Sequence, residues 1–155
     1  MSLQSIAGQD RAVRTLLNSL RERRLSHAYL FSGPPGTGKR RAALCFAKAI
    51  LCAREGDDAC GRCAECRKVD SGNHTALTII EPDGAFIKIE QIRALQREFA
   101  YRTASGRPKV AIIVHADRMT TEAANSLLKF LEEPTEAAVA ILVSDNGHAV
   151  LPTLL

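Results

Sequence analysis

Four of the five cysteines stand close together, at a spacing that suits a metal ion. Cys52, Cys60, Cys63 and Cys66 form the pattern C-x7-C-x2-C-x2-C. Four thiolates at short spacing are the ligand set of a tetrahedral zinc site, and four protein ligands leave no coordination position for a reacting water. We therefore predict a structural zinc ion in an insertion over residues 52–66. An iron–sulfur cluster is the competing interpretation, although nothing else in the sequence indicates electron transfer.

A glycine-rich segment, GPPGTGK at residues 33–39, matches the phosphate-binding pattern G-x-x-x-x-G-K. An apolar stretch precedes it and a helical pattern follows it, which is the context that this motif requires. The glycines let backbone N–H groups converge on phosphate oxygens, and Lys39 can reach the β and γ phosphates. A glycine-rich loop that binds nothing is the alternative. The predicted nucleotide-binding residues are Gly33, Pro34, Gly36, Thr37, Gly38, Lys39 and Arg40.

Both elements that would hold a magnesium ion beside this loop are altered. The residue after the lysine of the motif is normally Ser or Thr, whose hydroxyl binds the metal. Here it is Arg40, a cation without an acceptor atom. The second element is an acid at the end of a later apolar strand, whereas VAIIV at residues 110–114 is followed by His115 and Ala116. We therefore expect the loop to take ATP or ADP without a working magnesium site, and ATPase activity to be weak or absent. The alternative is a small shift that lets Asp117 serve as the acid.

The hydrophobic pattern predicts alternating strands and helices that would position these residues. We expect strands over residues 28–32, 76–80, 110–114 and 139–143, and helices over residues 10–24, 39–53, 66–71, 89–101 and from Thr120 or Thr121 to Leu131. Continuously apolar strands separated by helices indicate a parallel sheet covered on both faces, which is an α/β fold. Cys45, inside the second of these helices, is predicted to be an ordinary buried apolar residue.

The composition limits the class of protein. A chain of 155 residues has room for one domain with a core, and 46% hydrophobic with 25% charged residues is the balance of a folded globular protein. The apolar run at residues 110–114 is too short to span a bilayer, and the first residues lack a secretory pattern, so we expect a cytoplasmic location. A net charge of +4 does not by itself identify a nucleic-acid partner.

Several longer segments together resemble the bacterial clamp-loader branch of the AAA+ ATPases. The cysteine insertion and NSLLKFLEEP in combination are specific to this branch, whereas the phosphate loop alone is not. The resemblance implies a P-loop AAA+ module over residues 1–155 that ends before the last strand and the lid, within a DNA polymerase III holoenzyme. The segments cover essentially the whole chain and are GQDRAVRTL, LSHAYLFSGPPGTGK, the cysteine insertion, IKIEQIRAL, GRPKVAIIVHADRMTTEAANSLLKFLEEP and ILVSDNGHAVLPTLL.

Within this branch the chain is more similar to the delta-prime type than to the gamma/tau motor type. The motor type has a threonine where this chain has Arg40, and Asp-Glu where this chain has Val114 and His115. The resemblance implies a rigid stator subunit that supports the loading of a sliding clamp onto primed DNA. The implied partners are the gamma/tau and delta subunits, with the clamp and the primed DNA engaged indirectly and no membrane. A motor ATPase of the same complex and a zinc-stabilised nucleotide-binding adaptor outside replication are the alternatives.

The resemblance also implies roles for single residues. Residues Ile6, Ala7 and Gly8 would lie near an adenine, and Gly36 to Arg40 would surround the phosphates. Ser144 falls at a polar sensor position at the end of the fourth strand. An ordinary hydroxyl at the end of a strand is the alternative for Ser144.

Overall fold

The computed structural model describes residues 14, 16, 18, 20, 28–32, 38–52, 59–72, 74–100, 109–132 and 138–145. All the predicted strands are present, and the predicted helices within these ranges begin and end within two residues of the expected positions. Of the expected helix over residues 10–24, only Arg14, Leu16, Asn18 and Leu20 are described, and all four are helical. The elements are β1 (Ala28–Ser32), α2 (Lys39–Leu51), α3 (Ala64–Asp70), β2 (Leu77–Ile80), α4 (Ile89–Ala100), β3 (Lys109–Val114), the 3-10 helix η2 (Ala116–Arg118), α5 (Thr121–Glu132) and β4 (Ala138–Ser144).

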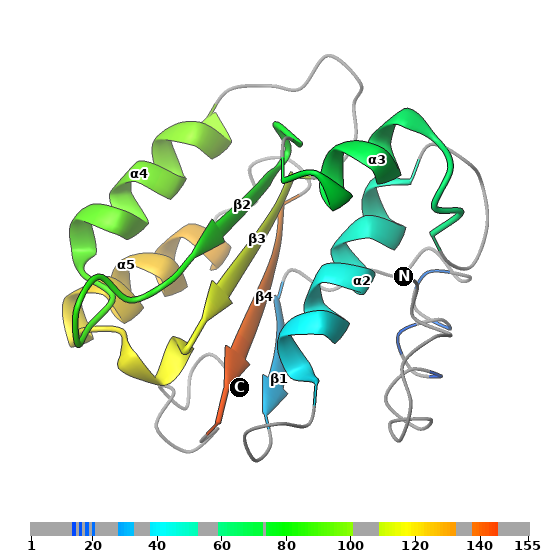
Figure 1. Ribbon diagram of the computed structural model, residues 1–155. Helices are drawn as coiled ribbons and strands as arrows, with labels where there is room; N and C mark the ends of the chain where they lie inside the picture. The colour runs from blue at the N-terminus through cyan, green and yellow to red at the C-terminus, as the bar shows by residue number, and fades with distance from the viewer. Residues whose placement is uncertain are drawn as a thin grey trace.

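The four strands form one parallel sheet in the order β1-β4-β3-β2, which confirms the predicted parallel arrangement. Ser32 at the end of β1 lies level with Ser144 at the end of β4, and Val114 at the end of β3 lies level with Val143. The carboxyl ends of the strands therefore meet at one edge of the sheet, where α2 also begins (Figure 1). In open parallel sheets this is the edge at which ligands bind.

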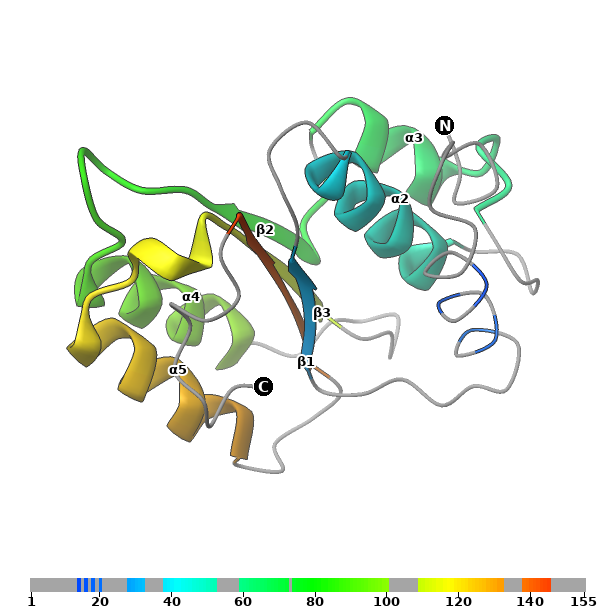
Figure 2. The same ribbon diagram turned by 90° about the horizontal axis from the view of Figure 1, so that it is seen from below.

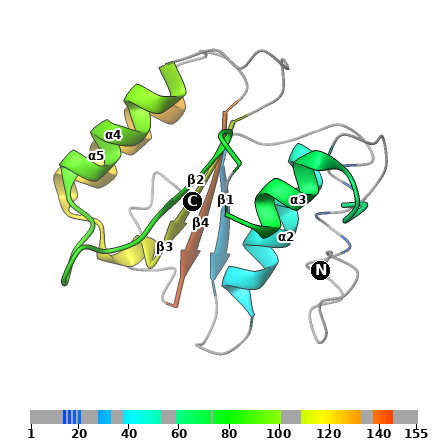
Figure 3. The ribbon, with the colours of Figure 1, turned by 45° about the horizontal axis from the view of Figure 1, so that its top comes forward.

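Helices cover both faces of the sheet, as predicted. Helices α2 and α3 lie on one face and α4 and α5 on the other (Figure 2 and Figure 3). The fully buried strand β3 serves both sides, because Val110, Ile112 and Val114 pack into the core beside α2 while Ala111 and Ile113 pack into the core beside α4 and α5. This alternation follows from the two-residue period of a strand. It explains why β3 carries an unbroken apolar run.

Individual residues of the helices behave as their sequence pattern predicts. Ile92 and Leu95 of the amphipathic helix α4 are buried, and Cys45 of α2 is buried among apolar side chains. The hydroxyl of Thr120 accepts the backbone N–H of Ala123 at 3.1 Å, so Thr120 rather than Thr121 caps α5. None of the helices in the described part of the chain combines the length and the apolar character needed to cross a membrane.

Candidate functional site

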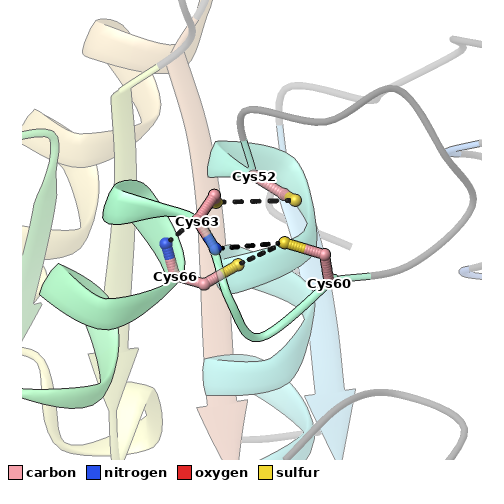
Figure 4. A group of neighbouring side chains, drawn as sticks. All are labelled: Cys52, Cys60, Cys63 and Cys66. Carbon is pink, nitrogen blue, oxygen red and sulfur yellow. Dashed lines mark hydrogen bonds between the residues drawn. The ribbon is translucent and has the colours of Figure 1, made fainter.

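The four predicted metal ligands converge at one end of α2 (Figure 4). Cys52 directly follows α2, Cys60 lies in the loop before α3, Cys63 is the N-cap of α3, and Cys66 lies in its first turn. The four Sγ atoms all lie within 4.8 Å of one another. The Cys52–Cys63 and Cys60–Cys66 sulfur pairs are each 3.9 Å apart.

These distances and the donor set fit a tetrahedral zinc ion. A Zn–S bond of about 2.3 Å places the sulfur atoms of a tetrahedron about 3.8 Å apart, close to the spacing found here. The backbone N–H groups of Arg62 and Cys63 donate to the sulfur of Cys60 at 3.4 and 3.3 Å, and the N–H of Cys66 donates to the sulfur of Cys63 at 3.4 Å. Such donors favour a thiolate over a thiol. The cluster is therefore compatible with a structural zinc ion.

The protein environment acts in opposite directions on two of these thiols. The backbone N–H groups of Arg62 and Cys63 lower the pKa of Cys60 to about 6. Burial raises the pKa of Cys66 to about 12. Coordination to a dication favours the thiolate form at every ligand. A bound metal ion would therefore lower the pKa of Cys66 and offset the effect of its burial. The contacts within the protein alone do not offset this effect.

Two side-chain contacts that the sequence analysis did not predict join the segments around the cysteine cluster to one another and to the rest of the domain. The ammonium group of Lys48, only 1% exposed, lies 2.9 Å from the carboxylate of Asp70 and so joins α2 to α3. His74 Nε2 pairs with Glu65, and His74 Nδ1 accepts the backbone N–H of Ala76 at 3.0 Å. The acceptor role of Nδ1 assigns the ring proton to Nε2, which donates to Glu65. A sequence signal existed for Lys48, since it is the one cation within the apolar stretch AALCFAKAIL.

The phosphate-binding residues are described only from Gly38 onwards. Gly33, Pro34, Gly36 and Thr37 lie outside the described residues, as do residues 6–8, which were expected near an adenine. Gly38 has a φ of 79°, in the left-handed region that side chains other than glycine disfavour. This conformation ends the loop, and α2 begins at the next residue, Lys39.

Helix α2 opens with the three consecutive cations Lys39, Arg40 and Arg41 and has no acidic residue in its first turn. This is an unfavourable arrangement, because the N-terminus of a helix already carries a partial positive charge. Two carboxylates from the ends of strands compensate for it. Lys39 Nζ lies 2.8 Å from Asp145 Oδ1, and an Arg40 guanidinium nitrogen lies 2.5 Å from Glu81 Oε1.

The topology explains why these carboxylates reach the helix. Asp145 directly follows β4 and Glu81 directly follows β2, so both lie at the edge where the parallel strands end. The hydrogen bond from Lys39 lowers the pKa of Asp145, and the positive charges nearby act in the same direction. Two of the three cations that open α2, Lys39 and Arg40, are therefore each paired with a carboxylate at this edge.

The end of β3 presents no acid to this edge. Val114 is buried, and His115 adopts φ 56° and ψ 52°, which is rare for a residue other than glycine. His115 Nδ1 lies 3.9 Å from Asp145 Oδ2. Asp117, the alternative acid, instead accepts the hydroxyl of the buried Ser144 at 3.1 Å.

A cavity of about 550 Å³ lies at the same edge. Its size is within the range of small-molecule sites in proteins. Asp117 is not among the residues that line it. The lining consists of Gly38, Lys39, Arg40, Arg41, Leu44, Val114, His115, Val143 and Asp145.

Comparison with known proteins identifies the family. The family described as "DNA polymerase III, delta subunit" matches residues 8–155. The chain belongs to this family. It is 47% identical over 147 residues to the DNA polymerase III subunit delta' of Bacillus subtilis, covering 95% of this chain and 45% of that protein. The delta' subunit of Pseudomonas aeruginosa is 40% identical over 133 residues, covering 83% of this chain and 40% of that protein.

The tau subunit of DNA polymerase III from Bacillus subtilis is also similar, at 36% identity over 154 residues that cover 98% of this chain and 27% of that protein. The resemblance to the delta-prime type, predicted from the sequence, is therefore confirmed. The chain spans less than half the length of these curated members and relatives of the DNA polymerase III delta subunit family.

Solved structures support the fold. The DNA polymerase III gamma subunit-related protein of Thermotoga maritima superposes with a TM-score of 0.64 at 26% identity, covering 91% of this chain and 42% of that one. The RuvB Holliday junction branch migration motor of the same organism superposes with a TM-score of 0.62 at 16% identity, covering 99% and 44%, and shows the fold alone. The predicted P-loop AAA+ fold with a four-cysteine cluster is thus confirmed.

Proposed function

We propose that the chain is part of a non-motor stator subunit of the clamp loader of DNA polymerase III. In this role it supports the loading of the sliding clamp onto primed DNA. One observation carries the proposal: the positions that would hold magnesium are occupied by Arg40, which pairs with Glu81, and by Val114 and His115. The higher identity to delta' than to tau of the same bacterium supports the same choice.

The physical reason concerns the ligands of magnesium. Mg²⁺ is bound by oxygen atoms in a nearly octahedral arrangement, and neither a guanidinium group nor a valine side chain supplies one. The carboxylates that line or face this edge within the described ranges, Asp145 and Glu81, are already paired with Lys39 and Arg40. We therefore propose that the subunit binds ATP or ADP weakly and without hydrolysis.

The proposed partners are the gamma/tau and delta subunits, and the proposed location is the cytoplasm. A subunit of this kind acts by shape, so its fold has to be rigid. We propose a zinc ion held by Cys52, Cys60, Cys63 and Cys66 as one source of this rigidity. The Lys48–Asp70 pair and the His74–Glu65 pair act in the same direction.

The test is an assembly experiment with the full-length protein that contains this chain. Mixed with gamma/tau and delta, it should elute with them as one complex in size-exclusion chromatography. The isolated protein should show no magnesium-dependent ATP hydrolysis, measured beside gamma/tau as the positive control. Magnesium-dependent turnover would support the motor alternative. Failure to assemble with the other subunits would support the adaptor alternative.

A further inference from the structure

The Asp145 carboxylate contacts the ammonium group of Lys39, the group with which this class of phosphate loop binds the phosphates of its ligand. In the motif, the lysine ammonium group is the part that reaches the β and γ phosphates. Here Lys39 Nζ lies 2.8 Å from Asp145 Oδ1, and the Lys39 side chain is only 10% exposed. Since the Lys39 side chain has little open surface and its ammonium group contacts Asp145, an incoming phosphate oxygen would meet the carboxylate at this position.

The other charges at this edge hold the carboxylate in place. Its second oxygen lies 3.9 Å from His115 Nδ1, and Lys39, His115 and Arg118 all favour the ionised form. Lys39 makes the largest contribution, and the pKa of Asp145 lies below its usual value. At neutral pH the group is therefore a full negative charge on the wall of the cavity that Lys39 and Arg40 also line.

A carboxylate and a phosphate oxygen are equivalent partners for an ammonium group, since both accept charge-assisted hydrogen bonds. They cannot both occupy the same position on Lys39, and they repel each other. In a hydrolytic P-loop site, magnesium screens the charge of the phosphates. The metal ligands are altered in this chain, so the repulsion from Asp145 acts without that screening.

We propose that Asp145 is an internal competitor that sets the affinity of the phosphate site for the polyphosphate group of a nucleotide. This inference rests on the nucleotide binding in the proposed function and names its regulation. A nucleotide binds when its phosphates displace the carboxylate from Lys39. In the free protein the Asp145 carboxylate supplies a negative charge at the N-terminus of α2, where the first turn of the helix has no acidic residue.

The test is a titration of the full-length protein with a fluorescent ATP analogue in buffer without magnesium. Asp145→Asn removes the negative charge while preserving the shape of the side chain, and should tighten binding about tenfold. Asp83→Asn is the control. It removes a negative charge from an exposed carboxylate near the end of β2 that does not line the cavity. It should change the affinity less than about twofold, as for an exposed charge screened by salt. Lys39→Ala should weaken binding in both backgrounds.

Each result has a distinct meaning. Tighter binding by Asp145→Asn alone, with circular dichroism unchanged, supports the competitor. Equal affinity of Asp145→Asn and the unchanged protein overturns it, while a loss of affinity in Lys39→Ala would keep nucleotide binding itself intact. If neither the unchanged protein nor Asp145→Asn binds, both the competitor and the nucleotide-binding part of the proposed function fall. The stator role is judged separately, by co-elution with gamma/tau and delta.

Discussion

The cysteine cluster and the phosphate-binding edge lie at opposite ends of α2, and they differ in where their counter-charges come from. At the cysteine end, four sulfur atoms of one kind gather within 4.8 Å of one another, and backbone N–H groups donate to the sulfur of Cys60. At the phosphate end, Lys39 and Arg40 each have a carboxylate within 2.8 Å.

The difference shows what each end requires. A cluster of four thiolates would be electrostatically incomplete without a cation, so a bound metal ion would be part of the folded structure. At the phosphate end the phosphate-binding lysine already has a carboxylate partner, so an anionic ligand there has to compete. Changes at the cysteine end should therefore affect mainly stability. Loss of an ion pair at the phosphate end should affect mainly binding and change stability only slightly.

The largest effect is expected from the loss of a metal ligand. Cys66→Ser should abolish the stoichiometric zinc that we propose and lower the free energy of unfolding by about 3 kcal/mol or more, because the metal ion would cross-link α2 to α3. The measurements are metal analysis of the purified protein and its thermal unfolding. Cys45→Ala is the control, since Cys45 is buried away from the cluster and its replacement should preserve the zinc content. Full zinc content in Cys66→Ser would contradict the assignment.

A smaller effect at the same end is expected from the buried ion pair. Asp70→Ala removes the carboxylate from the buried ammonium group of Lys48 and should cost about 2 kcal/mol of unfolding free energy. Lys48→Met should cost less, about 1 kcal/mol, because Asp70 is 43% exposed and can be hydrated without its partner. Urea denaturation measures both. Equal losses in the two variants would show that the pair, rather than the buried charge, determines the cost.

At the phosphate end, the strained backbone of His115 gives the first test of the difference between the two ends of α2. Its φ of 56° is unfavourable for a side chain but not for glycine. His115→Gly should therefore raise the free energy of unfolding by about 0.5–1 kcal/mol, even though it removes the imidazole that lies 3.9 Å from Asp145. Thermal unfolding provides the measurement, with His74→Gly as a contrasting variant that should be destabilising. A loss of stability in His115→Gly would mean that its imidazole contributes more than its backbone conformation costs.

The smallest effect is expected at the exposed pair Arg40–Glu81. Both side chains are about half exposed, at 54% and 50%, so water and salt screen their attraction. Glu81→Gln should change the free energy of unfolding by less than about 0.5 kcal/mol. Chemical denaturation at low and high salt is the appropriate measurement. A change comparable to that of Asp70→Ala would remove the distinction between the two ends.

The sequence predicted correctly those structural features that depend on residues close together along the chain. The spacing of Cys52 to Cys66 predicted their convergence, and the apolar run ending at Val114 predicted a doubly covered strand. It could not predict that Asp145 pairs with Lys39, because that contact requires β4 to lie beside β1. The order of parallel strands is a long-range property that no local pattern encodes. For the same reason the pairing of Arg40 with Glu81, at the end of β2, was not anticipated.

The position of β1 also has a consequence for folding. Among the described strands its partner is β4, and Ala28 pairs with Ala140, so most of this sequence is synthesised before the pairing can form. Until then the apolar side chains of β1 need another cover. Helix α2 can supply it locally, since the rings of Tyr29 and Phe31 lie 4.9 and 6.3 Å from the ring of Phe46. We therefore expect β1 and α2 to associate early, and to join the remaining strands in the slow, non-local step of folding.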